Sequence, residues 1–235
     1  MPRGMAMTLA ADNARRWSRA KMVRGDEFAA VARKLVAARS RYQIVAARTG
    51  VPWFVIAVIH QRESSQNWSA SLAQGDPWNR ISTHVPKGRG PFKSWEDAAV
   101  DALVNCPPQA ARNDDWSAGG TLTLLERYNG LGYANRGLPS PYIWSGTDQY
   151  VRGKYVADGV FDPNVVDRQL GCAGLLRAMM ALDPAISLPS SDIPDLPPPS
   201  NLPLPPAPSQ AAAGRIAALA RIWAALITLF RRSAL

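Results

Sequence analysis

The segment that decides the fold is Pro52-Trp53-Phe54-Val55-Ile56-Ala57-Val58-Ile59-His60-Gln61-Arg62-Glu63. Proline is favourable in the first turn of a helix, and the residues that follow it are apolar nearly all round. A helix of this kind belongs in the centre of a hydrophobic core. Polar side chains arrive only at its end, over residues 60–63. We therefore expect a central core helix whose last turn leaves the core.

Glu63 is the candidate catalytic residue of that last turn. A carboxyl group that donates a proton near neutral pH needs a raised pKa, and burial among apolar groups raises it by disfavouring the charged form. The end of an apolar helix, where the chain leaves the core, suits a half-buried acid that faces a cleft. The alternative is a structural ion pair of Glu63 with Arg62 or Arg89, and the pattern alone leaves both open.

Other stretches carry helical spacing or helix-start signals. They are 26–46, 94–105 with Ser94 as N-cap and Asp97 at the third position, 121–130 begun by Thr121, and 163–183 opened by Asp162-Pro163. Turn signals fill residues 64–95, where we expect loops and a short hairpin, and residues 131–163 are rich in loops. The fold class predicted is mainly α, with a helical part and a loop lobe that together form a cleft.

The ends of the chain differ in charge from its middle. The formal net charge is +9: residues 1–50 hold eleven Lys and Arg against three acids, residues 51–200 hold twelve against fifteen, and residues 201–235 hold four against none. A mildly acidic middle argues against a basic nucleic-acid-binding core. The basic ends favour contact with phospholipid, lipopolysaccharide or wall polymer, and solvated basic helices without a partner are the alternative.

Composition divides the chain into four segments: a basic N-terminal segment at 1–24, a domain at 25–184, a proline-rich linker at 185–210 and a cationic amphipathic helix at 211–235. Residues 184–208 hold ten of the twenty prolines, which is typical of an extended linker. The apolar run between Arg221 and Arg231 has nine residues, whereas spanning a membrane needs roughly twenty. We therefore expect the last helix to lie on an anionic membrane surface rather than to cross the membrane.

The N-terminus has no apolar run of the signal-peptide kind before Asp12. We expect the protein to be made in the cytoplasm, to act as a monomer in the periplasm or cell wall, and to reach it by another route. Cys106 and Cys172 lack metal-type spacing and are interpreted as isolated thiols. His60 and His84 are the only two histidines, too few in this context for a zinc amidase or a Cys-His peptidase. We expect no metal and no cofactor.

Two short motifs point to a known family. The apolar helix ends in Glu63-Ser64, and Tyr128-Asn129-Gly130 follows later within Leu124-Leu125-Glu126-Arg127-Tyr128-Asn129-Gly130. This combination resembles the lysozyme-like superfamily over roughly residues 45–180, with goose-type lysozymes and lytic transglycosylases as the nearest members. In that family the Glu of the Glu-Ser pair is the acid, and the Tyr-Asn-Gly element lines the sugar site.

The resemblance implies an α+β lysozyme-like fold and an enzyme that acts on peptidoglycan, with Glu63 as its acid. The segments 140–145 and 153–155 also resemble phage-type, endolysin-like and proteobacterial lysozyme-like proteins. Ser64, Tyr128, Asn129, Tyr133, Tyr142 and Trp144 are the predicted sugar contacts, because aromatic faces stack on sugar rings and Asn can bond an N-acetyl group. Core packing is an equal alternative for Tyr142 and Trp144, and Glu126 is interpreted as a charge on a helix surface.

One departure from the family affects the expected product. Lytic transglycosylases carry a Gly-Leu-Met-Gln-like segment after the acid, whereas this chain has Leu72-Ala73-Gln74-Gly75-Asp76-Pro77-Trp78. Asp76 becomes a candidate second carboxylate that holds the attacking water. The order Glu63, Asp76, Thr83 resembles the Glu, Asp, Thr order of phage-type lysozymes, although the spacing differs. Thr83 and His84 are candidates to orient the water, with ordinary surface-loop residues as the alternative. Ordinary turn chemistry explains Gly-Asp-Pro equally well.

The sequence therefore predicts a muramidase that hydrolyses the β-1,4 bond between N-acetylmuramic acid and N-acetylglucosamine. A lytic transglycosylase, a chitin- or chitosan-cleaving relative, and a non-catalytic wall-binding or secretion-associated protein are the alternatives.

Overall fold

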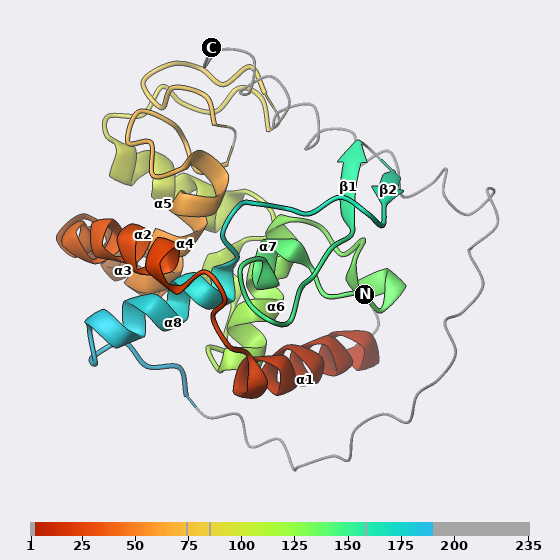
Figure 1. The fold of residues 1–235 in the computed structure, drawn as a ribbon. Coiled ribbons are helices and arrows are strands. Elements are labelled where there is room, and N and C mark those ends of the chain that lie inside the picture. Colours follow the sequence, from red (N-terminus) through yellow and green to blue (C-terminus); the bar gives the residue numbers. More distant parts are fainter. Residues whose placement is uncertain (1–2, 74, 85, 158, 190–235) are drawn as a thin grey trace. The chain divides into compact units, whose positions relative to one another are not determined.

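A computed structural model gives the fold and describes residues 3–189 except 74, 85 and 158. The chain divides into two units, one of residues 1–151 and 168–191 and the other of residues 152–167 and 192–235. The proline-rich linker and the cationic helix predicted for the C-terminal part lie, from residue 190 onward, outside the described residues. The described chain is mainly helical with one small antiparallel sheet (Figure 1), which confirms the mainly α prediction.

The larger unit contains all the α-helices of the described chain. They are α1 (Arg3–Arg19), α2 (Gly25–Ala37), α3 (Arg39–Thr49), α4 (Trp53–Ser64), α5 (Trp95–Asn105), α6 (Ala118–Tyr128), α7 (Pro141–Trp144) and α8 (Cys172–Leu182), with short 3-10 turns at Ala110–Arg112 and Ala134–Arg136. Within the described residues, no single helix is long and apolar enough to cross a membrane, and one sharply bent pair, α3 with α4, meets the length and composition criteria.

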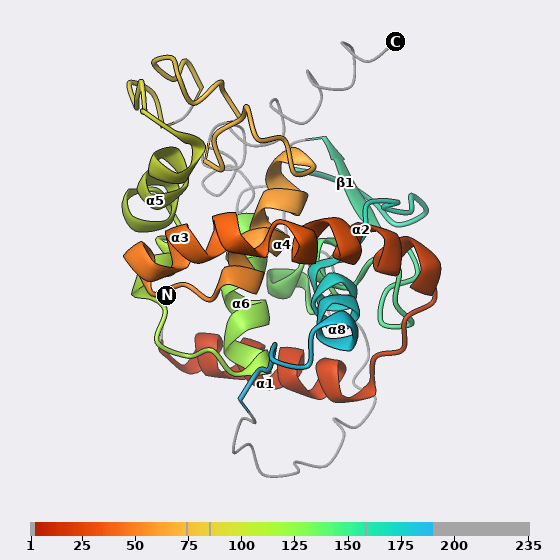
Figure 2. The same cartoon turned by 90° about the vertical axis from the view of Figure 1, so that its left-hand side faces the viewer.

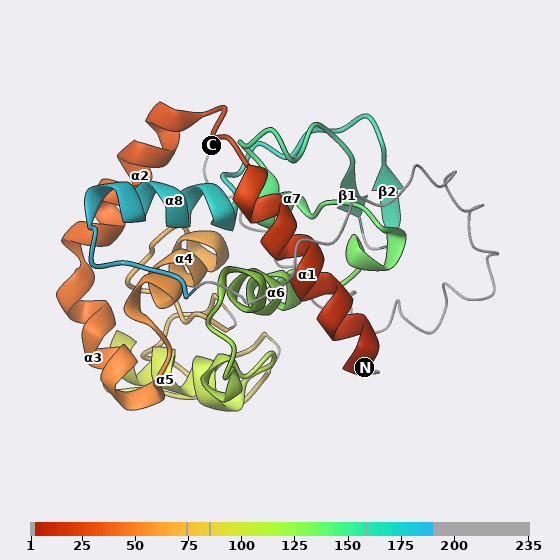
Figure 3. The ribbon, with the colours of Figure 1, turned by 90° about the horizontal axis from the view of Figure 1, so that it is seen from below.

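Helix α4 is the centre of this unit, as its apolar sequence predicts. All its side chains from Phe54 to His60 are buried, and it packs against α3, α8 and α2, which surround it in Figure 3. Pro52 precedes the helix in an extended conformation. Ser65 ends it in the left-handed conformation, with φ of 53°, so the chain turns sharply just after Glu63.

The single helix predicted for 26–46 is wrong, because the structure breaks it at Ala38 into α2 and α3 (Figure 2). Neither glycine nor proline marks the break, and Ala38 has φ −91° and ψ 11°. Packing gives the reason: α2 buries Leu35 and its neighbours against α8, whereas α3 buries Tyr42 and Val45 against α4 and α5. A straight helix would not put both apolar faces on the same core.

The predicted start of α5 is confirmed, since the Ser94 hydroxyl accepts a hydrogen bond from the Asp97 amide at 3.1 Å.

Helix α6 begins at Ala118 with Ser117 as its N-cap, three residues before the predicted Thr121. Its early turn is glycine-rich because α1 crosses it closely (Figure 3). A Cβ on Gly119 would lie 2.5 Å from the carbonyl oxygen of Ala10. The basic N-terminal segment is thus a helix that belongs to the larger unit.

The last predicted helix, 163–183, is wrong over its first nine residues, because α8 begins only at Cys172. The Asp162 carboxylate accepts a hydrogen bond from the Asn164 amide at 2.8 Å, so Asp-Pro forms a turn there rather than a helix cap. Gly171 precedes α8 because a Cβ there would lie 2.4 Å from the Ile143 carbonyl oxygen. That close approach lets α8 pack directly against α7.

The smaller unit holds the sheet, in which β1 (Lys154–Ala157) pairs antiparallel with β2 (Val160–Asp162). Tyr155 faces Phe161 across the hairpin, and Lys154 forms an ion pair with Asp167 at 3.1 Å. The hairpin predicted for residues 64–95 is not found among the described residues of that stretch, where a single isolated bridge joins Ala70 to Pro77.

Candidate active site

Glu63 occupies the last turn of α4, where the residue as a whole is half-buried and its carboxyl group is surrounded by protein. The Tyr142 hydroxyl donates a hydrogen bond to Glu63 Oε1 at 2.6 Å. Tyr142 comes from α7, 79 residues further along the chain, and its buried ring fixes the position of the hydroxyl. The structure thus joins two residues that the sequence predicted separately, one as the acid and one as a sugar contact.

The Arg62 guanidinium packs against the ring of Tyr142. It lies 4.2 Å from the ring centre of Tyr142 and donates to the Leu170 carbonyl oxygen at 2.8 Å. The Gln169 side-chain amide donates in turn to the Arg62 carbonyl oxygen at 3.1 Å. The segment before α8 therefore holds the end of α4 in place.

The alternative of a structural ion pair at Glu63 is contradicted. Arg62 is directed to a carbonyl oxygen, and Arg89 forms its ion pair with Asp101. Among the described residues, neither arginine lies within ion-pair distance of Glu63. Arg62 still acts on the carboxyl electrostatically without touching it.

Burial raises the pKa of Glu63 to about 7, while the Tyr142 hydrogen bond and the positive charge of Arg62 oppose the rise. Glu63 is therefore largely protonated in mildly acidic solution and ready to donate. The Tyr142 hydroxyl is itself kept neutral, because burial and the nearby Glu63 raise its pKa well above the usual range. The site thus combines a protonated carboxyl with a neutral phenol.

Tyr128 and Cys172 complete the surroundings of the acid. Both are buried, and Glu63 contributes to the raised pKa of each, after burial as the larger cause. The Tyr128 hydroxyl has no hydrogen-bond partner among the described residues. Cys172 and Cys106 are free thiols, as predicted.

A cluster of aromatic side chains anchors the end of α4. His60 is fully buried among Tyr42, Trp68 and Trp95, with ring centres 4.6 Å apart for each tryptophan. The Tyr42 hydroxyl lies 3.0 Å from His60 Nδ1, and the Asn67 carbonyl oxygen lies 3.1 Å from Nε2. One neutral tautomer satisfies both contacts, in agreement with a pKa that burial lowers to about 4.

Asp76 is tied into its own loop. Its Oδ2 accepts hydrogen bonds from the Thr83 and His84 amides at 2.8 and 3.0 Å, and its Oδ1 lies 2.5 Å from His84 Nδ1. Burial alone would raise the pKa of Asp76, but the contacts with His84 and Thr83 together outweigh it and lower the pKa. Within the described residues no hydrogen bond joins Asp76 to Glu63. The structure therefore brings Asp76, Thr83 and His84 together, and the lowered pKa keeps Asp76 a carboxylate.

The remaining predicted sugar contacts are placed differently. The Ser64 hydroxyl donates within α4 to the His60 carbonyl oxygen at 3.1 Å. Asn129 is exposed at the C-terminal end of α6, and Tyr133 is buried. Trp144 is 0% exposed, so its ring faces are closed to stacking. Core packing, the alternative weighed for Trp144, describes its position.

The structure contradicts the interpretation of Glu126 as a charge on a helix surface. Its side chain is 2% exposed, and the Asn13 side-chain amide donates to Glu126 Oε2 at 3.3 Å and to Thr123 Oγ1 at 3.2 Å. Burial raises the pKa of Glu126 to about 7. The burial of Glu126 was missed in the sequence because the packing of α1 against α6 was not predicted. Asn13 on α1 covers this carboxyl.

In the described part of the chain no three His, Cys, Asp or Glu side chains gather in a metal-binding group. Comparison of the chain with models of protein families, with curated proteins and with solved structures gives no match.

Proposed function

We propose that the protein is a peptidoglycan hydrolase with a lysozyme-like fold and that Glu63 is its general acid. One observation carries the proposal: the carboxyl of Glu63, at the end of the core helix, accepts a 2.6 Å hydrogen bond from Tyr142 and has a pKa that burial raises to about 7. An acid in this state can protonate the bridging oxygen between N-acetylmuramic acid and N-acetylglucosamine. The short motifs at Glu63-Ser64 and Tyr128-Asn129-Gly130 suggest the substrate.

The surroundings of Glu63 suit both halves of the reaction. Before the proton is donated, burial favours the neutral carboxyl. Afterwards, the Tyr142 hydroxyl and the positive charge of Arg62 stabilise the carboxylate that remains. Neither group needs to move far, since Arg62 is held to Leu170 and the Tyr142 ring is buried.

Water is proposed to attack with help from the Asp76, Thr83 and His84 cluster. A carboxylate offers about four lone-pair positions, and three contacts at Asp76 are already made. One position on Oδ1 is therefore free to orient a water molecule. Hydrolysis gives reducing ends, whereas the alternative lytic transglycosylase gives 1,6-anhydro ends, and mass spectra of digested sacculi distinguish them.

Glu63→Gln tests the acid, because the amide keeps the size and the hydrogen bond of the carboxyl but cannot donate the catalytic proton. The rate of turbidity loss of purified sacculi should fall by about a hundredfold to ten-thousandfold, since general acid catalysis contributes about 10²–10⁴. Glu27→Gln, an exposed substitution of the same kind on α2, should keep full activity. Normal clearing by Glu63→Gln would refute the assignment, and a loss of clearing in Glu126→Gln would then move the acid to Glu126.

A non-catalytic wall-binding protein is the alternative of another class. It would sediment with sacculi and release no fragments, and its binding would survive Glu63→Gln. Release of soluble muropeptides by the unmodified chain, lost in Glu63→Gln, excludes it.

A further inference from the structure

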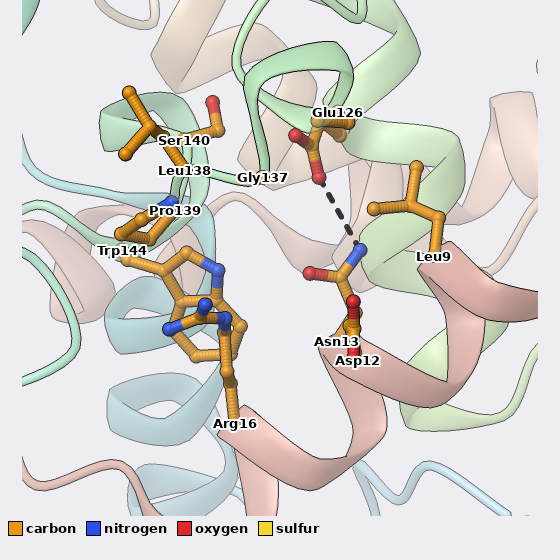
Figure 4. Close-up of a pocket in the computed structure, with 11 residues that line it drawn as sticks. Leu9, Asp12, Asn13, Arg16, Glu126, Gly137, Leu138, Pro139, Ser140 and Trp144 are labelled. Carbon is orange, nitrogen blue, oxygen red and sulfur yellow. Dashed lines mark hydrogen bonds between the residues drawn. The ribbon is translucent and has the colours of Figure 1, made fainter. Parts of the chain in front are cut away.

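A cavity of about 40 Å³ lies in the larger unit between α1, α6 and α7. Figure 4 shows Arg16, Asn13, Glu126 and Trp144 arranged around this space, with Ser140 at its edge. At about 10–15 Å³ for each water position, the cavity holds about three non-hydrogen atoms. That is room for one small polar group and too little for a sugar ring.

Two buried side chains that line the cavity lack hydrogen-bond partners. Trp144 is 0% exposed and Ser140 is 1% exposed. Neither Trp144 Nε1 nor Ser140 Oγ forms a hydrogen bond within the described residues. A buried polar group left unpaired costs free energy, so native proteins normally satisfy it with protein, water or ligand. Both groups can donate a hydrogen bond, and the indole nitrogen can only donate.

Arg16 adds a positive charge to the same wall. Its guanidinium forms no hydrogen bond or ion pair with a described residue, whereas the neighbouring Arg15 is paired with Asp12. Burial first, and then Arg15, lowers the pKa of Arg16, while Glu126 opposes the change. A half-buried guanidinium without a partner favours the entry of an anion.

We propose that this cavity binds a carboxylate group, held by the Arg16 guanidinium, the Trp144 indole N–H and the Ser140 hydroxyl. A carboxylate fits because it is planar, has the size of the cavity and accepts from several donors at once. The proposal does not rest on the glycosidase activity. The source is either a free small acid or the carboxylate of a larger molecule, such as a lactyl or D-alanyl group.

Glu126 makes the site sensitive to pH. The charged and titratable groups near it are Arg16 and Asp12 from α1 and Cys172 from α8, and Asp12 is paired with Arg15. Burial raises the pKa of Cys172 to about 12, so the thiol stays neutral. Protonated Glu126 donates to the ligand, whereas the carboxylate form repels it. Since burial raises the pKa of Glu126 to about 7, binding should weaken between pH 6 and pH 8.

The test follows the indole N–H signals of the eight tryptophans by NMR in the full chain, with Trp144→Phe identifying the signal of Trp144. At pH 6, sodium acetate should shift that signal saturably, and sodium chloride at equal ionic strength should not. Arg16→Gln should weaken acetate binding about tenfold or more. Arg19→Gln, an exposed change at the end of α1, should leave it unchanged.

Ser140→Ala and Glu126→Gln keep the proposal testable if Arg16→Gln unfolds. Ser140→Ala removes an unpaired hydroxyl, so it should keep the unfolding midpoint and weaken acetate binding several-fold. Glu126→Gln should retain binding and abolish its pH dependence. Equal effects of acetate and chloride, or unchanged affinity in both Arg16→Gln and Ser140→Ala, would overturn the proposal.

Larger ligands then identify the source of the carboxylate. N-acetylmuramic acid is compared with N-acetylglucosamine, which lacks the lactyl carboxylate, and D-alanyl-D-alanine forms a third arm. Binding of acetate alone assigns the site to free small acids, and added binding of the muramic acid or the dipeptide assigns it to that larger molecule. Saturable shifts of the Trp144 signal by both sugars, with equal affinity, would contradict carboxylate recognition.

Discussion

Replacing Tyr142 by Phe tests how the acid is tuned. The change removes the hydroxyl that donates to Glu63 Oε1 at 2.6 Å and keeps the buried ring under which Arg62 lies. A hydrogen bond to a charged acceptor contributes about 1.5–3 kcal/mol, and one to a neutral group about 0.5–1.5 kcal/mol. The difference of about 1–1.5 kcal/mol favours the ionised carboxyl. At 1.36 kcal/mol for each pH unit, its loss raises the pKa of Glu63 by about one unit.

The activity profile should move in the same direction. The acid works in its protonated form, so the alkaline limb of kcat, expected near the pKa of about 7, should shift upward by about one pH unit in Tyr142→Phe. The assay is the initial rate of turbidity loss of sacculi from pH 5 to pH 9, scaled to the rate at pH 5. Tyr150→Phe changes another buried tyrosine that takes no part in the pKa of Glu63 and should leave the limb in place. An alkaline limb that stays fixed or moves downward in Tyr142→Phe would refute the reasoning.

Three further predictions concern stability. In urea titrations, Glu63→Gln should raise the free energy of unfolding by about 1–3 kcal/mol at pH 8 and by little at pH 4. The pKa of Glu63 is raised to about 7 in the folded protein and is about 4.5 in the unfolded chain. The stability of the unmodified protein is therefore complete below pH 4.5 and is lost as the pH rises through 7, whereas glutamine stays neutral throughout. Burial lowers the pKa of His60 to about 4, so the free energy of unfolding should fall by up to about 3 kcal/mol from pH 6.5 to pH 4. His60→Gln should flatten this pH dependence. An equal slope in both proteins would contradict the prediction. Gly119→Ala should cost about 1–3 kcal/mol in thermal unfolding, since its Cβ would lie 2.5 Å from the Ala10 carbonyl oxygen, whereas Gly25→Ala meets nothing within 4 Å and should be neutral.

Local sequence predicts an element well when its signal has one meaning. The apolar run after Pro52 is too hydrophobic to lie anywhere but in the core, and α4 is there. Ser94 followed by Asp97 is an N-cap signal, and the cap forms. Asp162-Pro163 is a signal with two meanings, because the same residues open helices and make turns, and here the turn forms.

Tertiary packing decides what local sequence leaves open. Nothing near Ala38 disfavours a helix, yet the chain breaks there so that α2 and α3 reach different neighbours. The same limit holds at the candidate site. Glu63 could be predicted from its place at the end of an apolar helix, but its hydrogen bond to Tyr142 spans 79 residues. Sequence spacing gives no means of pairing Glu63 with Tyr142. Tyr142 was instead predicted as a sugar contact, because it is an aromatic residue in a loop-rich segment.

The two buried glutamates show why a raised pKa does not by itself identify a catalytic acid. Burial raises the pKa of both Glu63 and Glu126 to about 7, and α7 serves both sites, through Tyr142 at one and Trp144 at the other. Accessibility separates them. Glu126 is 2% exposed and faces a cavity of about 40 Å³, so its proton cannot reach the bridging oxygen of a polymer. The residue Glu63 is only half-buried, next to the turn at Ser65, and the proposed function requires a glycan strand to reach it there. Different roles are therefore proposed for the two glutamates: proton donation to a large substrate at Glu63, and a pH-sensitive wall of a small-anion site at Glu126.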